Sequence, residues 1–135
     1  PATLSDEEGA LVEPLAVAVR ALAQAKATYA DRVVIIGGGT IGLLCLAVAV
    51  ANGVKETMIT VKYPQQARLA RELGADHVVD ITQTNVRDAV KELTGGLGTD
   101  GVVETVGGAR QIEDGLSIVR KRGTAVVVAG HFEPL

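Results

Sequence analysis

The sequence is poor in aromatic side chains and carries no excess of positive charge. Its 135 residues include no tryptophan, and aromatic residues make up only 2%. Proteins that bind single-stranded nucleic acid stack bases on aromatic side chains, so this composition offers no such surface. The formal net charge of -3, with 13 basic residues scattered among 16 acidic ones, provides no basic patch for a phosphate backbone. We therefore expect no nucleic-acid partner.

Cysteine and long apolar runs are scarce as well. Cys45 is the only cysteine, so the chain cannot form an internal disulfide, and a reducing cytoplasm is the compartment that fits it. The longest apolar run, residues 41–51, is shorter than the roughly 20 residues that a membrane-spanning helix needs. The start of the chain lacks the pattern of a secretory leader. These absences predict a cytoplasmic protein with no membrane partner.

The two ends of the chain suggest a fragment. The sequence begins without methionine, and it closes with GHFEPL directly after a predicted strand, with no further helix. Its length and its 47% hydrophobic content suffice for one domain with its own core. We expect a single domain taken from a larger protein.

Strand and helix patterns alternate regularly along the chain. A helical pattern runs from Ser5 to about Ala27, and Pro14 is expected to break or kink it near Glu13. The predicted strands then span residues 32–36, 57–61, 77–79, 101–105 and 124–129. The predicted helices between them span residues 40–51, 65–73 and 109–120. A further helix between the third and fourth strands is predicted to have its cap within residues 80–84 and to end at residue 93. This succession predicts the α/β class: a Rossmann-type, doubly wound parallel sheet of about five strands in a three-layer αβα arrangement.

A glycine-rich loop follows the first predicted strand. The stretch IIGGGTIGLL, residues 35–44, has the pattern G-x-G-x-x-G and opens a helix. Gly37 is expected to make the tight turn, Gly39 to let the backbone approach a pyrophosphate, and Gly42 to let the helix pack closely on the strand. The amides of Thr40 and Ile41 would face phosphate charge. A structural turn in another doubly wound fold is the alternative, but strand, loop and helix together favour dinucleotide binding.

The end of the second predicted strand bears on which dinucleotide is bound. In NAD-binding domains, an acid about 20 residues after the loop binds the ribose 2′-hydroxyl. Here the stretch TVKYP places Lys62 at that distance from Gly42. A lysine attracts a 2′-phosphate, with Arg68 as a second cation, so the sequence favours NADP over NAD. A solvent-facing lysine at the end of a strand is the alternative.

Five stretches resemble, in order, the zinc-type medium-chain dehydrogenases, a family that includes sorbitol, threonine and alcohol dehydrogenases. They are GALVEPLAVAVRAL (9–22), DRVVIIGGGTIGLL (31–44), RELGADHVVD (71–80), GTDGVVETVGG (98–108) and GTAVVVAG (123–130). The resemblance implies the NAD(P)-binding domain of a zinc-dependent alcohol or polyol dehydrogenase, an oxidoreductase that transfers hydride between an alcohol and a nicotinamide cofactor. It implies a leading helical interdomain segment over 1–30, a dinucleotide-binding domain over 31–135, and an N-terminal catalytic domain that this chain lacks.

The resemblance also implies roles for single residues. Thr105 and Val106 match the family's stretch under the nicotinamide ribose, and Gly130 matches the turn beside the nicotinamide. Glu13, in an EP motif, matches a glutamate at the catalytic zinc, as a ligand or near one; a helix carboxylate without a metal is the alternative. The other zinc ligands belong to the missing domain, and neither Cys45 nor either histidine has a partner at ligand spacing.

Two other protein classes also place glycines after their first strand. A non-catalytic, nucleotide-sensing regulatory module has no use for the EP motif at Glu13, and a methyl-donor-binding domain needs an acid where this chain has Lys62. We therefore expect the chain to seat the cofactor and to contain no catalytic residue of its own. The parent enzyme is expected to act on a small alcohol or polyol and to form a homo-oligomer.

Overall fold

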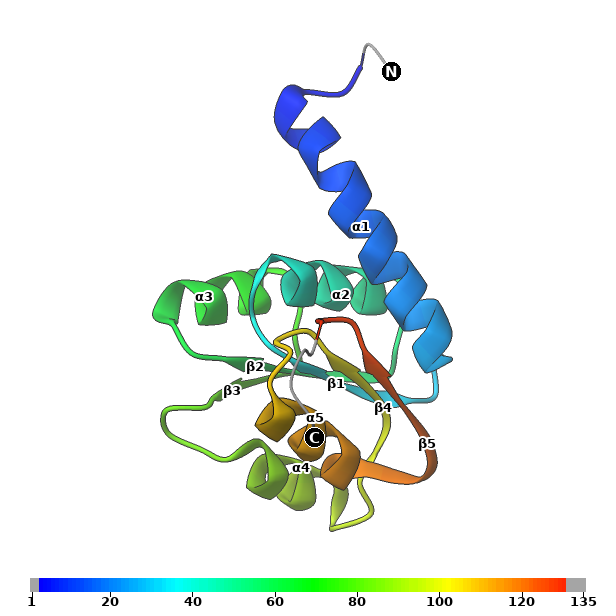
Figure 1. Ribbon diagram of the computed structural model, residues 1–135, viewed down its shortest axis with the longest axis vertical. Coiled ribbons are helices and arrows are strands. Elements are labelled where there is room, and N and C mark those ends of the chain that lie inside the picture. Colours follow the sequence, from blue (N-terminus) through cyan, green and yellow to red (C-terminus); the bar gives the residue numbers. More distant parts are fainter. Residues whose placement is uncertain (1–2, 131–135) are drawn as a thin grey trace.

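The computed structural model describes residues 3–130, and within that range five helices alternate with five strands (Figure 1). The helices are α1 (Asp6–Ala25), α2 (Thr40–Ala51), α3 (Pro64–Glu72), α4 (Val86–Thr94) and α5 (Ala109–Ile118). The strands are β1 (Arg32–Ile36), β2 (Glu56–Val61), β3 (His77–Asp80), β4 (Thr99–Glu104) and β5 (Val119–Val127). His131, for which we expect no ligand role, lies outside the described residues. No helix over residues 3–130 has both the length and the apolar character needed to cross a membrane.

The strands form one parallel sheet in the order β3-β2-β1-β4-β5. The first strand, β1, pairs with β2 on one side and with β4 on the other, so the chain reverses its direction of winding there. Open α/β sheets bind their ligands outside the carboxyl ends of the strands at such a point. The predicted parallel sheet is confirmed, and its topology marks one end of β1 as the place to look for a site.

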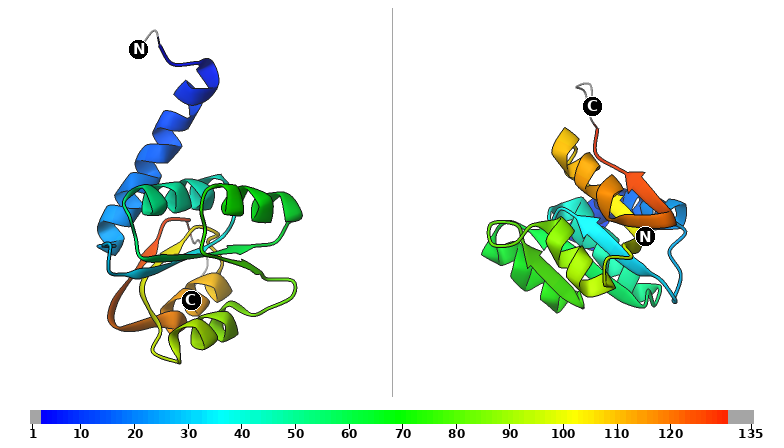
Figure 2. Two further views of the ribbon diagram at one scale, coloured as in Figure 1. Left: turned by 180° about the vertical axis from the view of Figure 1, so that it is seen from behind. Right: turned by 90° about the horizontal axis from the view of Figure 1, so that it is seen from below.

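Helices cover both faces of the sheet, which confirms the three-layer arrangement (Figures 1 and 2). Val33 and Ile35 of β1 pack in the core beneath α1, α2 and α3, whereas Val34 and Ile36 pack in the core formed with α4 and α5. Successive side chains of a strand point to opposite faces. A strand covered on both faces is therefore apolar at every position, which is why the run VVII predicts it.

The first helix continues through Pro14 without the break that the sequence prediction allowed. Proline removes the hydrogen bond to the carbonyl four residues earlier, which here belongs to Ala10. Ala10 is exposed, so water can solvate the carbonyl that proline leaves free. Figure 1 shows the reason for this exposure: the first half of α1 projects beyond the sheet.

The start of α4 was also predicted wrongly. The side chain of Asn85 caps this helix by accepting the Arg87 amide at 2.8 Å. Asp80, which the sequence places in the capping segment, instead accepts the amide and the hydroxyl of Thr82 at 2.9 and 2.7 Å. Asp80 thus closes a local turn after β3, a structure in which short acidic side chains compete with helix initiation.

The last strand begins earlier than predicted. It starts at Val119, directly after α5, includes the polar stretch RKRG, and ends at Val127, two residues before the predicted end. Within it, Arg122 has a φ of 67°, and the pairing with β4 is irregular between Thr99 and Gly101. An edge strand accepts charged side chains and bulges that a central strand excludes. Hydropathy alone therefore missed its first half.

Candidate functional site

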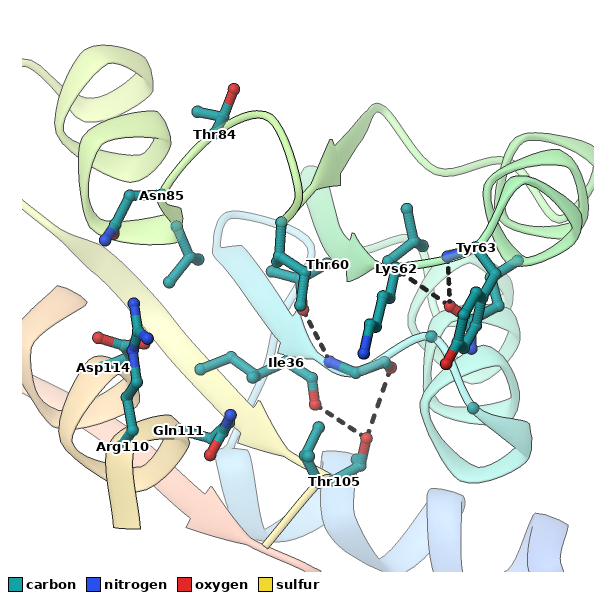
Figure 3. A pocket seen from close by; sticks show the side chains of 18 residues that line it. Ile36, Thr60, Lys62, Tyr63, Thr84, Asn85, Thr105, Arg110, Gln111 and Asp114 are labelled. Carbon is teal, nitrogen blue, oxygen red and sulfur yellow. Dashed lines mark hydrogen bonds between the residues drawn. The ribbon is translucent and has the colours of Figure 1, made fainter. Parts of the chain in front are cut away.

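A cavity of about 450 Å³ opens at the carboxyl ends of β1, β2 and β4 (Figure 3). It is lined by the glycine loop 37–39, the end of β2 and the turn after it (60–63), the segment that leads into α4, residues 105 and 106 after β4, and the first turns of α5. Elements far apart in the sequence therefore meet at the topological switch point, where α/β sheets bind ligands.

The three glycines of the motif have different surroundings. Gly37 has a φ of +109°, and a Cβ placed on it would lie 2.7 Å from both Thr105 Oγ1 and Val106 Cγ2. A Cβ on Gly42 would lie 1.8 Å from the Gly37 carbonyl oxygen. A Cβ on Gly39 would meet no atom within 4 Å. The fold therefore requires glycine at 37 and 42, whereas at Gly39 the backbone is open to an incoming group.

Two threonines fix the glycine loop from opposite sides. The Gly37 amide donates to Thr60 Oγ1 at 2.9 Å. Thr105 donates its hydroxyl to the Ile36 carbonyl at 2.9 Å and, more weakly, to that of Gly37 at 3.5 Å (Figure 3). Sequence reasoning identified Thr105 and missed Thr60, which is one of two threonines in β2 and belongs to no motif. These bonds hold the loop in one conformation.

The N-terminus of α2 has no internal partner for its first amides. Its cap residue is Gly39, which has no side chain to cap them, and no acidic residue occupies the first turn. The first helical amide bond runs from Leu43 to the Gly39 carbonyl at 2.9 Å. Free amides and the helix dipole together attract anions. Thr40, Ile41 and Gly42 follow the cavity lining directly but are not part of it, and the amide role of Thr40 and Ile41 stays a prediction.

The end of β2 has no carboxylate beside the glycine loop. Val61 is the last residue of β2 and is buried, and a Cβ on Gly38 would lie 2.9 Å from its Cγ1. Lys62 follows, is exposed and lines the cavity, with its ammonium 5.6 Å from the centre of the Tyr63 ring. Gln66 Oε1 accepts the amides of Lys62 and Tyr63 at 3.0 and 3.2 Å. Gln66, which sequence reasoning missed, therefore fixes the turn that carries Lys62.

The second cation of the cleft is not the residue that the sequence indicates. Arg68 lies on α3 opposite Glu72, at 4.0 Å, and is outside the cavity lining. Arg110, from the first turn of α5, lines the cavity instead. Asp114, one turn further along α5, also lines it and pairs with Arg87 of α4 at 2.6 Å. Sequence reasoning missed Arg110 because it followed only the end of the second strand.

The remaining predicted cofactor residues lie around the turn after β4. Val106 lines the cavity and has 54% of its surface exposed. Gly130 is outside the lining, but its carbonyl oxygen would be 2.7 Å from a Cβ on Gly107. Gly130 therefore lies against the same turn. The structure brings together around the cleft Gly37, Gly39, Lys62, Thr105 and Val106.

The predicted metal residue lies apart from this cleft. Glu13 is exposed on α1 and lines a separate, shallow cavity of about 360 Å³ between α1 and β5. Over residues 3–130, no three His, Cys, Asp or Glu side chains come close enough to hold a metal ion. Cys45 is buried in the core, where burial raises its pKa to about 11, so its thiol remains protonated and unsuited to metal binding. His77 contacts Glu56 at 2.9 Å.

Comparisons with known proteins agree with this geometry. The chain is 35% identical to a sorbitol dehydrogenase of Halalkalibacterium halodurans over 136 residues, covering 99% of the chain and 39% of that protein. The structure of 2R,3R-butanediol dehydrogenase from Bacillus subtilis superposes with a TM-score of 0.88 at 33% identity, covering 99% of this chain and 38% of that one. A structure from Sinorhizobium meliloti 1021, described as a zinc-binding dehydrogenase bound to NADP, gives a TM-score of 0.87 at 29% identity, with 97% and 39% covered.

The chain thus spans about two fifths of the length of these relatives. A family model for zinc-binding dehydrogenases matches residues 40–135, which include the helix after the glycine loop, the cleft residues from Thr60 onward and the edge strand. Together with the relatives, this match confirms the resemblance seen in the sequence. The chain belongs to the zinc-binding dehydrogenase family.

Proposed function

We propose that the chain is the NAD(P)-binding part of a zinc-dependent dehydrogenase that acts on an alcohol or polyol. In this proposal residues 31–135 form the dinucleotide-binding domain and residues 1–30 the helical segment that leads into it. The observation that carries the proposal is the open backbone at Gly39, which faces a cleft beside the uncapped N-terminus of α2. The names of the relatives, sorbitol and butanediol dehydrogenases, support the substrate class.

The residues around the cleft fit a nicotinamide dinucleotide. Gly39 admits a pyrophosphate close to the backbone, and the free amides of Thr40 and Ile41 donate to its oxygens. Thr105 and Val106 take the nicotinamide-ribose side, with Gly130 behind them. The cofactor supplies the hydride acceptor, and the protein supplies binding, orientation and exclusion of water.

We further propose that NADP is preferred to NAD. Val61, the buried residue at the end of β2, offers no acceptor for a ribose 2′-hydroxyl. Lys62, which follows it and lines the cleft, offers a positive charge for a 2′-phosphate. The NADP bound to the Sinorhizobium meliloti structure supports this choice by analogy.

Zinc and substrate belong, in this proposal, to the rest of a longer protein. Glu13 is the one residue of this chain that we assign to the neighbourhood of zinc, and a single carboxylate does not make a zinc site. The residues described here therefore do not fit the metal by themselves. We expect the chain alone to bind the cofactor without oxidising an alcohol. The cytoplasmic location and a homo-oligomeric assembly remain predictions.

Fluorescence titration with NADPH and NADH tests the proposal, because the chain has no tryptophan to obscure the nicotinamide signal. We expect saturable binding of both, with NADPH preferred. Lys62→Asp removes the cation and adds a hydroxyl acceptor, so the NADPH:NADH affinity ratio should fall by about tenfold or more. Lys55→Asp, an exposed charge change before β2, is the control and should leave the ratio unchanged. Absence of binding would contradict the dinucleotide site. An unchanged NADPH:NADH affinity ratio in Lys62→Asp would show that Lys62 does not determine the choice of cofactor.

A further inference from the structure

A buried carboxylate lies beneath the cleft. Glu104 is the last residue of β4, is only 1% exposed, and is paired in register with Ile36 of β1 and Val127 of β5. Among the buried residues of the described range it is the only charged one. Burying a carboxylate is costly unless hydrogen bonds compensate it. Its position at the carboxyl end of a central strand therefore requires an explanation.

One oxygen of this carboxylate holds the turn after β4. Glu104 Oε1 accepts the amides of Val106 and Gly107 at 2.6 and 2.9 Å. The other oxygen, Oε2, is buried and has no hydrogen-bond partner within residues 3–130. A buried acceptor without a partner lowers the stability of the fold. The carboxylate thus fixes the turn 105–107 at a cost in stability.

The turn that Glu104 holds is in direct contact with the glycine loop. Thr105 donates its amide and its hydroxyl to the Ile36 carbonyl, at 3.0 and 2.9 Å. The side chains of Thr105 and Val106 fill the space where a Cβ of Gly37 would stand. A displacement of the turn would therefore move either the loop or the exposed Val106 side chain into the cleft.

We propose that Glu104 is a positioning residue of the dinucleotide site. Its carboxylate fixes the turn 105–107 and, through Thr105, the conformation of Gly37 that the cofactor binds. The inference rests on the proposed function, because it assigns the cost of the buried carboxylate to the shape of the cofactor cleft. In this role Glu104 raises the affinity for the cofactor, in addition to any contribution that it makes to folding.

The test compares the dissociation constant for NADPH with the free energy of unfolding in urea. Glu104→Gln keeps a carbonyl oxygen for the two amides, so its affinity should stay within about threefold of the unmodified chain. Glu104→Ala removes the acceptor, and its affinity should fall by about tenfold or more. Val102→Ala, a fully buried change in the same strand away from the turn, is the matched control. It should lower stability without changing affinity.

Two outcomes would overturn the positioning role. One is a folded Glu104→Ala protein that binds NADPH as tightly as the unmodified chain. The other is an equal loss of affinity in Val102→Ala, which would show that lost stability alone weakens binding. If Glu104→Ala does not fold, Thr105→Val replaces it: this variant breaks the next contact in the series and should also weaken binding by about tenfold. Unchanged affinity there would equally overturn the proposal.

Failure of the proposed function gives a different result. In that case the unmodified chain binds neither NADPH nor NADH, whatever stands at position 104. Amide hydrogen exchange at Gly37, Val106 and Gly107 then still tests the contact series. Faster exchange at all three amides in Glu104→Ala, and not in Val102→Ala, is the result expected if the carboxylate holds turn and loop together. Unchanged protection would overturn it.

Discussion

The three glycines of the loop serve the fold and the ligand separately. Gly37 is required by its positive φ and by the side chains against it, and Gly42 by the carbonyl of Gly37. Gly39, with a φ of -76° and free space at its missing Cβ, is required by neither. Its absence of a side chain is therefore useful only to a group that approaches from the cleft.

This difference predicts that alanine at position 39 weakens cofactor binding, whereas alanine at position 42 lowers the stability of the fold. Gly39→Ala should change the free energy of unfolding by less than about 1 kcal/mol, because the new methyl group meets open space. It should nevertheless weaken NADPH binding by about tenfold or more, because the methyl group obstructs the pyrophosphate. Gly42→Ala should destabilise the fold, since its Cβ would overlap the Gly37 carbonyl. Urea unfolding and fluorescence titration of both variants check this, and unchanged NADPH affinity in Gly39→Ala would refute the assignment of Gly39 to the pyrophosphate site.

At the scale of single residues, the sequence predicted those parts of the cleft that belong to a motif. The glycine loop and Lys62 have fixed spacings along the chain, so they could be found before the structure. Thr60, Gln66 and Arg110 could not, because each reaches the cleft through its position in the folded domain. Thr60, for example, bonds Gly37 only because β2 pairs with β1 in one register, and no sequence spacing encodes that register.

At the scale of elements, the strands were predicted better than the ends of the helices. The central strands are covered on both faces, so their continuous apolar runs are unambiguous. The start of α4 was ambiguous because Asp80 and Asn85 can both cap a helix. The structure assigns the cap to Asn85, while Asp80 bonds Thr82 in a turn that follows β3 directly. Competition between two local hydrogen-bonded structures decided this boundary.

The position of this cap can be measured. Asn85→Ala should lower the free energy of unfolding by about 1 kcal/mol, because the Arg87 amide loses its acceptor. Asn85→Asp should retain stability, since a carboxylate also caps and interacts favourably with the helix dipole. Thr84→Ala, one residue earlier in the chain and within the capping segment 80–84 that the sequence predicts, should change stability by less than about 0.5 kcal/mol. An equal loss in Thr84→Ala, measured by urea unfolding, would contradict this assignment of the cap.

At the scale of the whole molecule, α1 has two different halves. Its second half is buried against the sheet and α2, and its first half projects (Figure 1). Three large apolar side chains of the first half, Leu11, Val12 and Leu15, are exposed, and Val19 of the second half continues this exposed stripe. The relatives are more than twice as long as this chain. Under the proposed function, in which the chain is part of a longer dehydrogenase, this exposed stripe offers a surface on which the remainder would pack.

The amino ends of the strands, at the end of the sheet opposite the cleft, carry a ladder of charged and ionisable side chains with one residue from each strand. In strand order these residues are His77, Glu56, Arg32, Asp100 and Arg120. Glu56 contacts His77 Nε2 at 2.9 Å and Arg32 Nε at 2.6 Å. Asp100 accepts the Arg32 amide at 2.8 Å and pairs with Arg120. Because each contact joins neighbouring strands, the ladder connects the amino ends of all five.

The ladder makes stability depend on acid pH. The hydrogen bond from His77, together with Arg32, holds the pKa of Glu56 below its usual value despite some burial. Burial alone would raise the pKa of Asp100, but the Arg32 amide and Arg120 lower it overall. A carboxyl with a lower pKa in the folded state stabilises the fold above its unfolded-state pKa. That stabilisation is lost as the pH falls through the folded-state pKa.

We therefore predict that Glu56→Gln reduces the free energy of unfolding at neutral pH and also flattens its decline between about pH 6 and pH 3. Glu92→Gln, on the exposed face of α4, should leave the decline unchanged and serves as the control. Urea unfolding across this range measures both variants, and a Glu56→Gln curve parallel to that of the unmodified chain would exclude Glu56 as a source of the acid sensitivity. Because the ladder and the cleft lie at opposite edges of the sheet, Glu56→Gln should bind NADPH normally at neutral pH. A loss of NADPH affinity would mean that breaking the ladder at the amino ends of the strands also displaces the glycine loop, through β1.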